Sequence, residues 1–171
     1  MTTVPEASRY VLDPGQSSVA ISQKGMWGLV TVKGAFTAVS GDGEVLPDGT
    51  GTGVIRVDAS SVDTKHTKRD THLRSADFFD VEKFPVIQFD ALSAARDASG
   101  KATVDGRLTI RGVAVAKPIT ATVTAVEPDA VTLATQFAVD RTAFGITWNQ
   151  MGMLRGETTV TATLRFTRTA A

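Results

Sequence analysis

Residues 64–89 read TKHTKRDTHLRSADFFDVEKFPVIQF, and this stretch decides the fold because strand-like alternation stops here. Charged side chains crowd around a few aromatic ones instead. Asp63 or Thr64 is expected to cap a short helix that begins near Lys65, since short oxygen-bearing side chains accept hydrogen bonds from the free N–H groups of a first turn. The stretch therefore predicts a helical insert around residues 64–80, laid against a β-structure.

The residues of this insert predict how it is held together and where it ends. Asp70 and Arg74 lie four residues apart, so they are expected to pair on one helix face. Phe78 and Phe79 are expected to be largely buried and to anchor the insert. Pro85 ends the segment, because the residue before a proline is disfavoured in the helical region.

Outward from the insert, both flanks have the pattern of β-strands. Apolar and polar residues alternate in short runs separated by turn signals, every 8–12 residues or so, which is typical of a sandwich or a barrel. Residues 30–40 are expected to form one long strand, residues 41–43 (GDG) a tight hairpin, and residues 47–49 (PDG) a turn. The chain is expected to be all-β, mainly antiparallel, and a single domain over residues 1–171, with residues 1–8 as a flexible N-terminus.

Composition excludes several classes of function. The 171 residues hold 18 basic and 18 acidic side chains, so no nucleic-acid partner is expected. The chain has no cysteine, which removes disulfides and thiolate chemistry. No apolar run approaches the roughly 20 residues of a membrane span, and the first residues lack the pattern of a secretory signal. The expectation is a soluble, cytoplasmic protein.

The polar residues of the insert are candidates for chemistry, but structural roles are favoured. His66 and His72 are the only imidazoles, and a spacing of six positions places them on different sides of a helix. No metal site and no cofactor are therefore expected. Asp77 and Asp80 could do acid–base work, yet they are expected to be caps and ionic partners. No catalytic residue is predicted.

Alternation in the strands defines an apolar stripe that a closed sheet would point inward. The stripe consists of Val19, Ile21, Phe36, Ile55, Val57, Ile87, Phe89, Leu108, Ile110, Phe137, Leu164 and Phe166. An eight-stranded barrel either fills with such side chains or holds one ligand. Small residues recur on the same faces and would leave volume; they are Gly34, Ala38, Gly106, Ala121, Ala125 and Ala162. Spacing alone leaves the filled and the hollow interior equally open.

Four segments together carry a resemblance to a known family. They are RDTHLRSADFFDVEKFP at residues 69–85, DPGQSSVAIS at 13–22, DGRLTIRGV at 105–113 and FAVDRTAFGITW at 137–148. In this order they resemble the YceI-like family, lipocalin-like proteins that bind polyisoprenoids. The resemblance covers nearly the whole chain, from about residue 10 to residue 166.

The resemblance implies a lipocalin-like closed eight-stranded β-barrel. It also implies binding, transport or storage of a long isoprenoid lipid, such as an isoprenoid quinone or a polyprenyl pyrophosphate, inside the barrel. The expected lipid contacts are Val19, Ile21, Phe36, Ile55, Val57, Phe78, Ile87, Phe89, Leu108, Ile110, Phe137 and Leu164. Family members carry histidines at the position of Gln16 and within residues 24–26, and both are missing here. The candidates for holding a polar head group are Lys24, Arg69, His72 and Arg74.

Two other functions stay open at this point. The chain could be an enzyme acting on a lipid, with Asp70, His72 and Asp77 near the barrel mouth. It could also be a ligand-free barrel that acts as an interaction module, for which a filled interior would be evidence. A homodimer is a further possibility.

Overall fold

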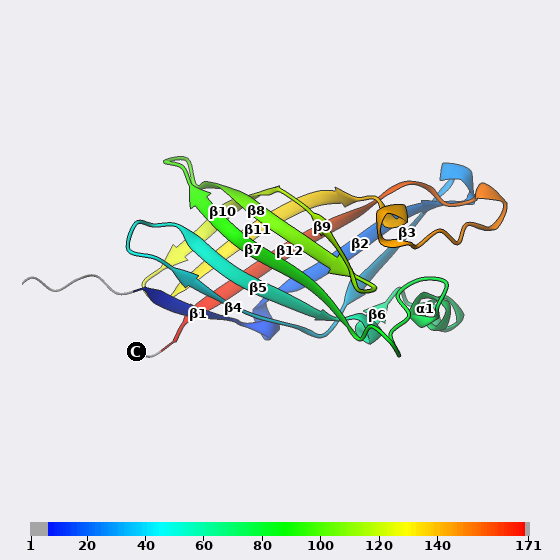
Figure 1. Ribbon diagram of the computed structural model, residues 1–171, viewed down its shortest axis with the longest axis horizontal. Helices are drawn as coiled ribbons and strands as arrows, with labels where there is room; N and C mark the ends of the chain where they lie inside the picture. The colour runs from blue at the N-terminus through cyan, green and yellow to red at the C-terminus, as the bar shows by residue number, and fades with distance from the viewer. Residues whose placement is uncertain (1–6, 170–171) are drawn as a thin grey trace, which may run out of the picture.

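The computed structural model describes residues 7–169, and most of them lie in antiparallel strands (Figure 1). The strands are β1 (Ser8–Leu12), β2 (Ser18–Gly25), β3 (Val30–Phe36), β4 (Val39–Val45), β5 (Gly51–Asp58), β6 (Val62–Asp63), β7 (Val86–Arg96), β8 (Lys101–Ile110), β9 (Val113–Ala116), β10 (Ile119–Glu127), β11 (Ala130–Val139) and β12 (Arg155–Arg168). The helix α1 (Thr67–Arg74) follows β6. Short 3-10 turns are η1 (Pro14–Gln16), η2 (Met26–Gly28), η3 (Ala59–Ser61), η4 (Arg141–Phe144) and η5 (Gln150–Gly152). No helix within residues 7–169 has the length and apolar character needed to cross a membrane.

The strands close into a barrel because three pairs of short strands each act as one bent strand. The first pair is β1 with β2, the second β3 with β4, and the third β5 with β6. β12 pairs with β1 and β2, which pair in turn with β4 and β3. β4 and β3 then pair with β5 and β6, and the order continues through β7, β8, β10 and β11 back to β12. This confirms the closed eight-stranded antiparallel barrel.

Strand β8 shows how the sequence pattern builds the wall. Ala102, Val104, Gly106, Leu108 and Ile110 are buried, whereas the residues that alternate with them are exposed or partly exposed. Leu108 lies opposite Phe89 of β7, so the inward faces of neighbouring strands coincide. Alternation with a period of two therefore translates directly into an apolar interior.

Residues 41–43 do not form the hairpin that the glycines predict; they lie inside β4. A Cβ on Gly41 would lie 2.6 Å from the carbonyl oxygen of Val54, so the glycine permits a close approach of β4 to β5. The turn predicted at residues 47–49 is confirmed and makes the hairpin between β4 and β5: Leu46 N–H donates to Thr50 O at 2.8 Å, and Gly49 takes a φ of 90°. The long strand expected over residues 30–40 is likewise wrong, because β3 ends at Phe36 and β4 begins at Val39.

The helix of the insert begins later than predicted. His66 is its N-cap, with Nδ1 accepting from the N–H of Arg69 at 3.2 Å. Neither Asp63 nor Thr64 caps α1, because Asp63 accepts from the N–H of Lys65 and Thr64 bonds to Asp70. The prediction failed because both oxygen-bearing side chains already have other partners.

Asp70 and Arg74 do not form the expected ion pair. Asp70 points to Thr64, while Arg74 Nε donates to the carbonyl oxygen of Ser60 at 2.8 Å. These hydrogen bonds therefore join the helix to the residues before it, and not one turn of the helix to the next.

The N-terminus was predicted to be flexible over residues 1–8. Residues 1–6 lie outside the described residues, whereas Ser8 belongs to β1 and pairs with Val45 of β4.

Candidate functional site

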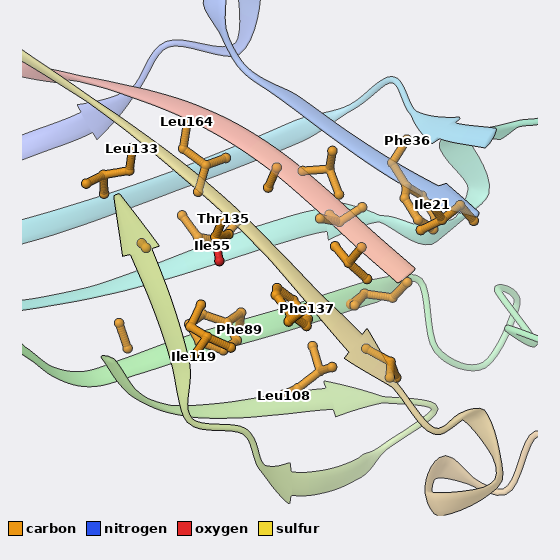
Figure 2. Close-up of a pocket in the computed structure, with 18 of the residues that line it drawn as sticks. Ile21, Phe36, Ile55, Phe89, Leu108, Ile119, Leu133, Thr135, Phe137 and Leu164 are labelled. Carbon is orange, nitrogen blue, oxygen red and sulfur yellow. The ribbon is translucent and has the colours of Figure 1, made fainter. Parts of the chain in front are cut away.

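A cavity of about 940 Å³ runs inside the barrel. Residues from both ends of the barrel line it, for example Tyr10 and Glu127 at one end and His72 and Trp148 at the other. Figure 2 shows Ile55, Phe89 and Phe137 pointing into this space from β5, β7 and β11. Every residue predicted to contact lipid lies on its wall; lipid contact itself stays a prediction. The interior is therefore not the filled core that a ligand-free barrel would have.

The small residues on the inward stripes do not all contribute open volume. Ala121 and Ala162 line the cavity, as expected. Gly106 instead makes room for a neighbour, because a Cβ there would lie 2.2 Å from Cζ of Phe89. Gly34 likewise makes room for Thr64, because a Cβ at position 34 would lie 2.8 Å from the Thr64 methyl carbon.

The other two small residues face outward. Ala125 is exposed because a β-bulge between Val123 and Ala125 shifts the register of β10 against β11. Ala38 is exposed at the break between β3 and β4. Strict alternation from Ile119 onward could not reveal the bulge, since one extra residue inverts every later position.

One end of the cavity, which we call the polar mouth, carries ring-bearing and charged side chains of α1 and of the loop after β11. His72 Nε2 lies 2.8 Å from Asp77 Oδ2. The His72 ring packs edge-on against Trp148 at 4.5 Å and against Phe78 at 5.0 Å between ring centroids. The predicted local packing of His72 is confirmed, and the contact fixes the ring at the cavity rim.

Phe78 and Phe79 hold the insert to the barrel, although both are partly rather than largely buried. Phe79 packs edge-on against Phe36 with ring centroids 5.6 Å apart. Both rings also line the cavity, and their remaining exposure results from that. They anchor the insert and form part of the wall at the same time.

Arg69 also lies at the polar mouth, held by Thr64. Its Nε donates to Thr64 Oγ1 and its Nη2 to Thr64 O, both at 2.8 Å. The carboxylate of Asp70, which is buried, accepts from the N–H of Thr64 at 2.9 Å and from its hydroxyl. Thr64 is therefore the shared partner that fixes Arg69 against the cavity wall.

Arg141 and Trp148 were missed by sequence reasoning, although both belong to the segment at 137–148. Arg141 lines the cavity, and its Nη1 donates to the carbonyl oxygens of Ile146 at 3.0 Å and Trp148 at 3.1 Å. Its Nε is shielded from solvent and has no hydrogen-bond partner among the described residues. A guanidinium with an unpaired, buried N–H is a site that an oxygen acceptor would satisfy.

The turn η4 sets the position of Arg141. Asp140 is its N-cap and accepts from the N–H of Thr142 at 3.0 Å and from its hydroxyl. These two hydrogen bonds, the hydroxyl first, hold the pKa of Asp140 below its usual value. A sequence signal for the position of Arg141 is this D-x-T cap directly after a strand.

The other two predicted head-group residues lie away from the cavity wall. Lys24 is exposed and donates to Thr31 Oγ1 on the outer side of β3, and Arg74 donates to Ser60 O and Val62 O. The structure thus brings together Arg69 and His72 of the four candidates and adds Arg141. His66, the N-cap of α1, and Lys68 in its first turn also line the cavity.

Neither a metal centre nor a catalytic triad can be assembled from the described residues. Residues 7–169 contain no group of three or more His, Asp or Glu side chains placed to hold a metal ion. Within the same range, no serine or threonine hydroxyl hydrogen bonds to the imidazole of His72, which bonds to Asp77 instead.

The sequence is similar to a known family and to bacterial proteins. The YceI-like domain family matches residues 10–166. A UPF0312 protein of Vibrio vulnificus is 35% identical over 126 residues, which is 70% of this chain and 66% of that protein. The chain thus spans just under two thirds of the length of that relative.

Solved structures share the fold at low identity. BcnA from Burkholderia cenocepacia superposes with a TM-score of 0.81 at 23% identity, covering 90% of this chain and 98% of that one. A polyisoprenoid binding domain from Saccharophagus degradans gives a TM-score of 0.75 at 15% identity, covering 94% and 98%. At these identities the likeness concerns the barrel alone.

Proposed function

The chain belongs to the YceI-like family, and from this premise we propose that it binds a long isoprenoid lipid with the tail inside the barrel. The observation that carries the proposal is the cavity of about 940 Å³ with its largely apolar wall. Small-molecule sites typically enclose about 300–1,000 Å³, so this cavity has the size of a dedicated ligand site. The polyisoprenoid binding domain from Saccharophagus degradans, which shares the barrel, supports the same ligand class.

Burial of the tail would supply most of the binding free energy. Each methylene group transferred from water to an apolar wall contributes about 0.8 kcal/mol before costs. Phe89, Phe137 and Ile55 offer rigid apolar surface halfway along the cavity. A branched, repetitive isoprenoid tail fits a long apolar channel of this kind better than a compact ligand does.

The polar mouth would hold the head group. Arg69 and Arg141 both line the cavity, and the buried Nε of Arg141 lacks a partner among the described residues. Guanidinium groups bind oxygen acceptors strongly, most of all phosphate. The mouth therefore suits a head rich in oxygen, either the carbonyls of a quinone or a pyrophosphate.

We assign no catalytic step to the pair of His72 and Asp77. Its 2.8 Å contact and the edge packing of the ring on Trp148 hold the imidazole in one orientation at the cavity wall. This arrangement supports hydrogen bonding to a head group, with Asp77 keeping the ring in one orientation.

Native mass spectrometry of protein purified from its own host, followed by organic extraction, tests the proposal. A co-purified isoprenoid lipid is the expected result. If neither this protein nor delipidated protein incubated with an isoprenoid quinone or a polyprenyl pyrophosphate gains the mass of a lipid, the proposal fails.

The same assay separates the two head groups. Arg141→Gln and Arg69→Gln should weaken binding of a polyprenyl pyrophosphate about tenfold or more and affect a quinone less, because the lost charge matters most to the anion. Arg56→Gln is the matched control, since Arg56 pairs with Asp42 on the barrel exterior.

A further inference from the structure

Two loops project beyond the barrel at the end that carries the polar mouth. They are the turns η2 and η5, drawn in blue and orange beyond the sheet in Figure 1. Leu29 is 84% exposed and Met151 78%, the highest values for large apolar side chains within residues 7–169. Met26 and Trp27 are about half exposed beside them. We call these four side chains the apolar tip.

Hydrogen bonds hold together the two loops that form the apolar tip. Trp27 N–H donates to Met153 O at 3.0 Å, and its indole Nε1 donates to Met151 O at 3.1 Å, so two hydrogen bonds join the η2 loop to the η5 loop. Met26, Trp27 and Met151 have φ values of 49°, 55° and 54°. This left-handed region is disfavoured for residues with a Cβ, and such strain is maintained mostly where it serves a function.

Positive charge lies directly behind the apolar tip. The cations of residues 22–34 and 145–158 are Lys24, Lys33 and Arg155, against the single acid Glu157. Lys24 and Arg155 are register partners between β2 and β12, and all three cations are exposed. Protruding apolar side chains backed by basic ones are the combination by which proteins lie on anionic membranes, and tryptophan favours that interface.

The strands that carry the tip also reach the cavity. Gln23, which precedes the η2 loop, and Leu154, which follows η5, both lie on the cavity wall. We propose that the apolar tip docks on the surface of an anionic lipid bilayer, with the polar mouth turned toward that surface. The proposal rests on the proposed function for its purpose, because a carrier of an insoluble lipid must exchange it with a membrane.

A bilayer fits the apolar tip better than a second copy of the chain does. Two copies joined tip to tip would bring Lys24, Lys33 and Arg155 of one copy close to the same cations of the other. Like charges across an interface oppose association. An anionic lipid surface instead complements these charges, and it accepts a convex, protruding tip without a matching groove.

Flotation of the full chain with vesicles tests docking. The vesicles are phosphatidylcholine alone or an equimolar mixture of phosphatidylcholine and phosphatidylglycerol. The parent should float with the mixed vesicles, and Leu29→Ser with Met151→Ser should reduce the bound fraction about tenfold. Val11→Ser with Leu92→Ser is the matched control, since these side chains are 44% and 49% exposed elsewhere on the barrel. This control should float as the parent does.

A second pair of variants tests the charge. Lys33→Glu with Arg155→Glu should also reduce flotation with mixed vesicles, and added salt should weaken the parent in the same direction. Unfolding midpoints equal to that of the parent confirm that each variant is folded. Docking is overturned if the parent does not float with mixed vesicles, if the tip variants float equally well, or if the parent is a dimer that the tip variants dissociate.

A loading assay tests the proposed function separately from docking: delipidated protein is incubated with a quinone in detergent, and the bound quinone is measured. Tip variants should load like the parent, because the tip does not line the cavity. Flotation without loading would contradict the proposed function and leave the docking surface standing. Loading without flotation would overturn the docking surface alone.

Discussion

Strand β8 and the insert at residues 64–84 are held in place by different physics. In β8 every second side chain is buried, and stability is spread over many apolar contacts and ladder hydrogen bonds. The insert has few buried side chains and depends on hydrogen bonds that join α1 to the residues before the helix. Asp70 accepts from the N–H of Thr64, Arg69 donates to the carbonyl oxygen of Thr64, and Arg74 donates to that of Ser60. The wall should therefore tolerate single changes that the insert does not.

The largest effect is expected at Asp70. Asp70→Ala removes the acceptor for both the N–H and the hydroxyl of Thr64, and it leaves that N–H unpaired in a buried place. Bonds to a charged acceptor and an unsatisfied donor together predict a loss of about 3 kcal/mol in the free energy of unfolding. Urea denaturation measures it.

Asp70→Asn is the matched control for this substitution. It keeps an acceptor oxygen of the same reach and loses only the charge, so the destabilisation should be clearly smaller than for alanine. If Asp70→Ala costs less than about 0.5 kcal/mol, the insert does not depend on this bond, and the contrast with β8 is wrong.

Phe79 gives the next effect, because it links the insert to the wall through Phe36. A fully buried phenylalanine loses about 3–5 kcal/mol on truncation to alanine. Phe79 is only partly buried, so Phe79→Ala should cost about 2 kcal/mol by the same measurement. Phe79→Leu keeps much of the apolar contact and should cost under about 1 kcal/mol. Equal losses for both variants would mean that the ring contributes through its edge contact alone.

The same contrast explains how far the sequence could predict the structure. Alternation in residues 101–110 predicted the buried face of β8 because strand period and burial are locally linked. The cap of α1 could not be predicted from spacing, since the oxygens of Asp63 and Thr64 are occupied by other partners. Residues 41–43 carry a hairpin signal, yet close packing against Val54 requires glycine there for another reason.

The polar mouth was predicted only in part for a related cause. Arg69 and His72 belong to one short segment, so the sequence alone predicted that they lie close together. Arg141 and Trp148 come from a loop about 70 residues further along the chain, and only barrel closure brings Trp148 within 4.5 Å of His72. No local pattern encodes such a contact.

Gly106 offers a test of the wall itself. Its missing Cβ makes room for the Phe89 ring, and a Cβ would also lie 2.7 Å from the carbonyl oxygen of Lys117. The ring can swing into the cavity but the backbone cannot move freely, so Gly106→Ala should destabilise by about 1–2 kcal/mol. Thermal unfolding of delipidated protein measures this. Unchanged stability would show that the wall relaxes more easily than its packing suggests.

The smallest effect on stability is expected at Ala121, which faces the cavity from β10. Ala121→Phe adds a ring to open volume rather than to packed atoms, so the free energy of unfolding of delipidated protein should change by less than about 0.5 kcal/mol or rise. Lipid binding should fall about tenfold or more, because the ring occupies space that the tail needs. Ala95→Phe is the control, since Ala95 is exposed on β7 and should alter neither quantity. The two measurements together distinguish a filled from a hollow interior. In a filled interior the added ring would lower the free energy of unfolding, whereas in a hollow interior it would lower lipid binding alone. A clear loss of stability in Ala121→Phe with unchanged lipid binding would show that the tail does not pass this point.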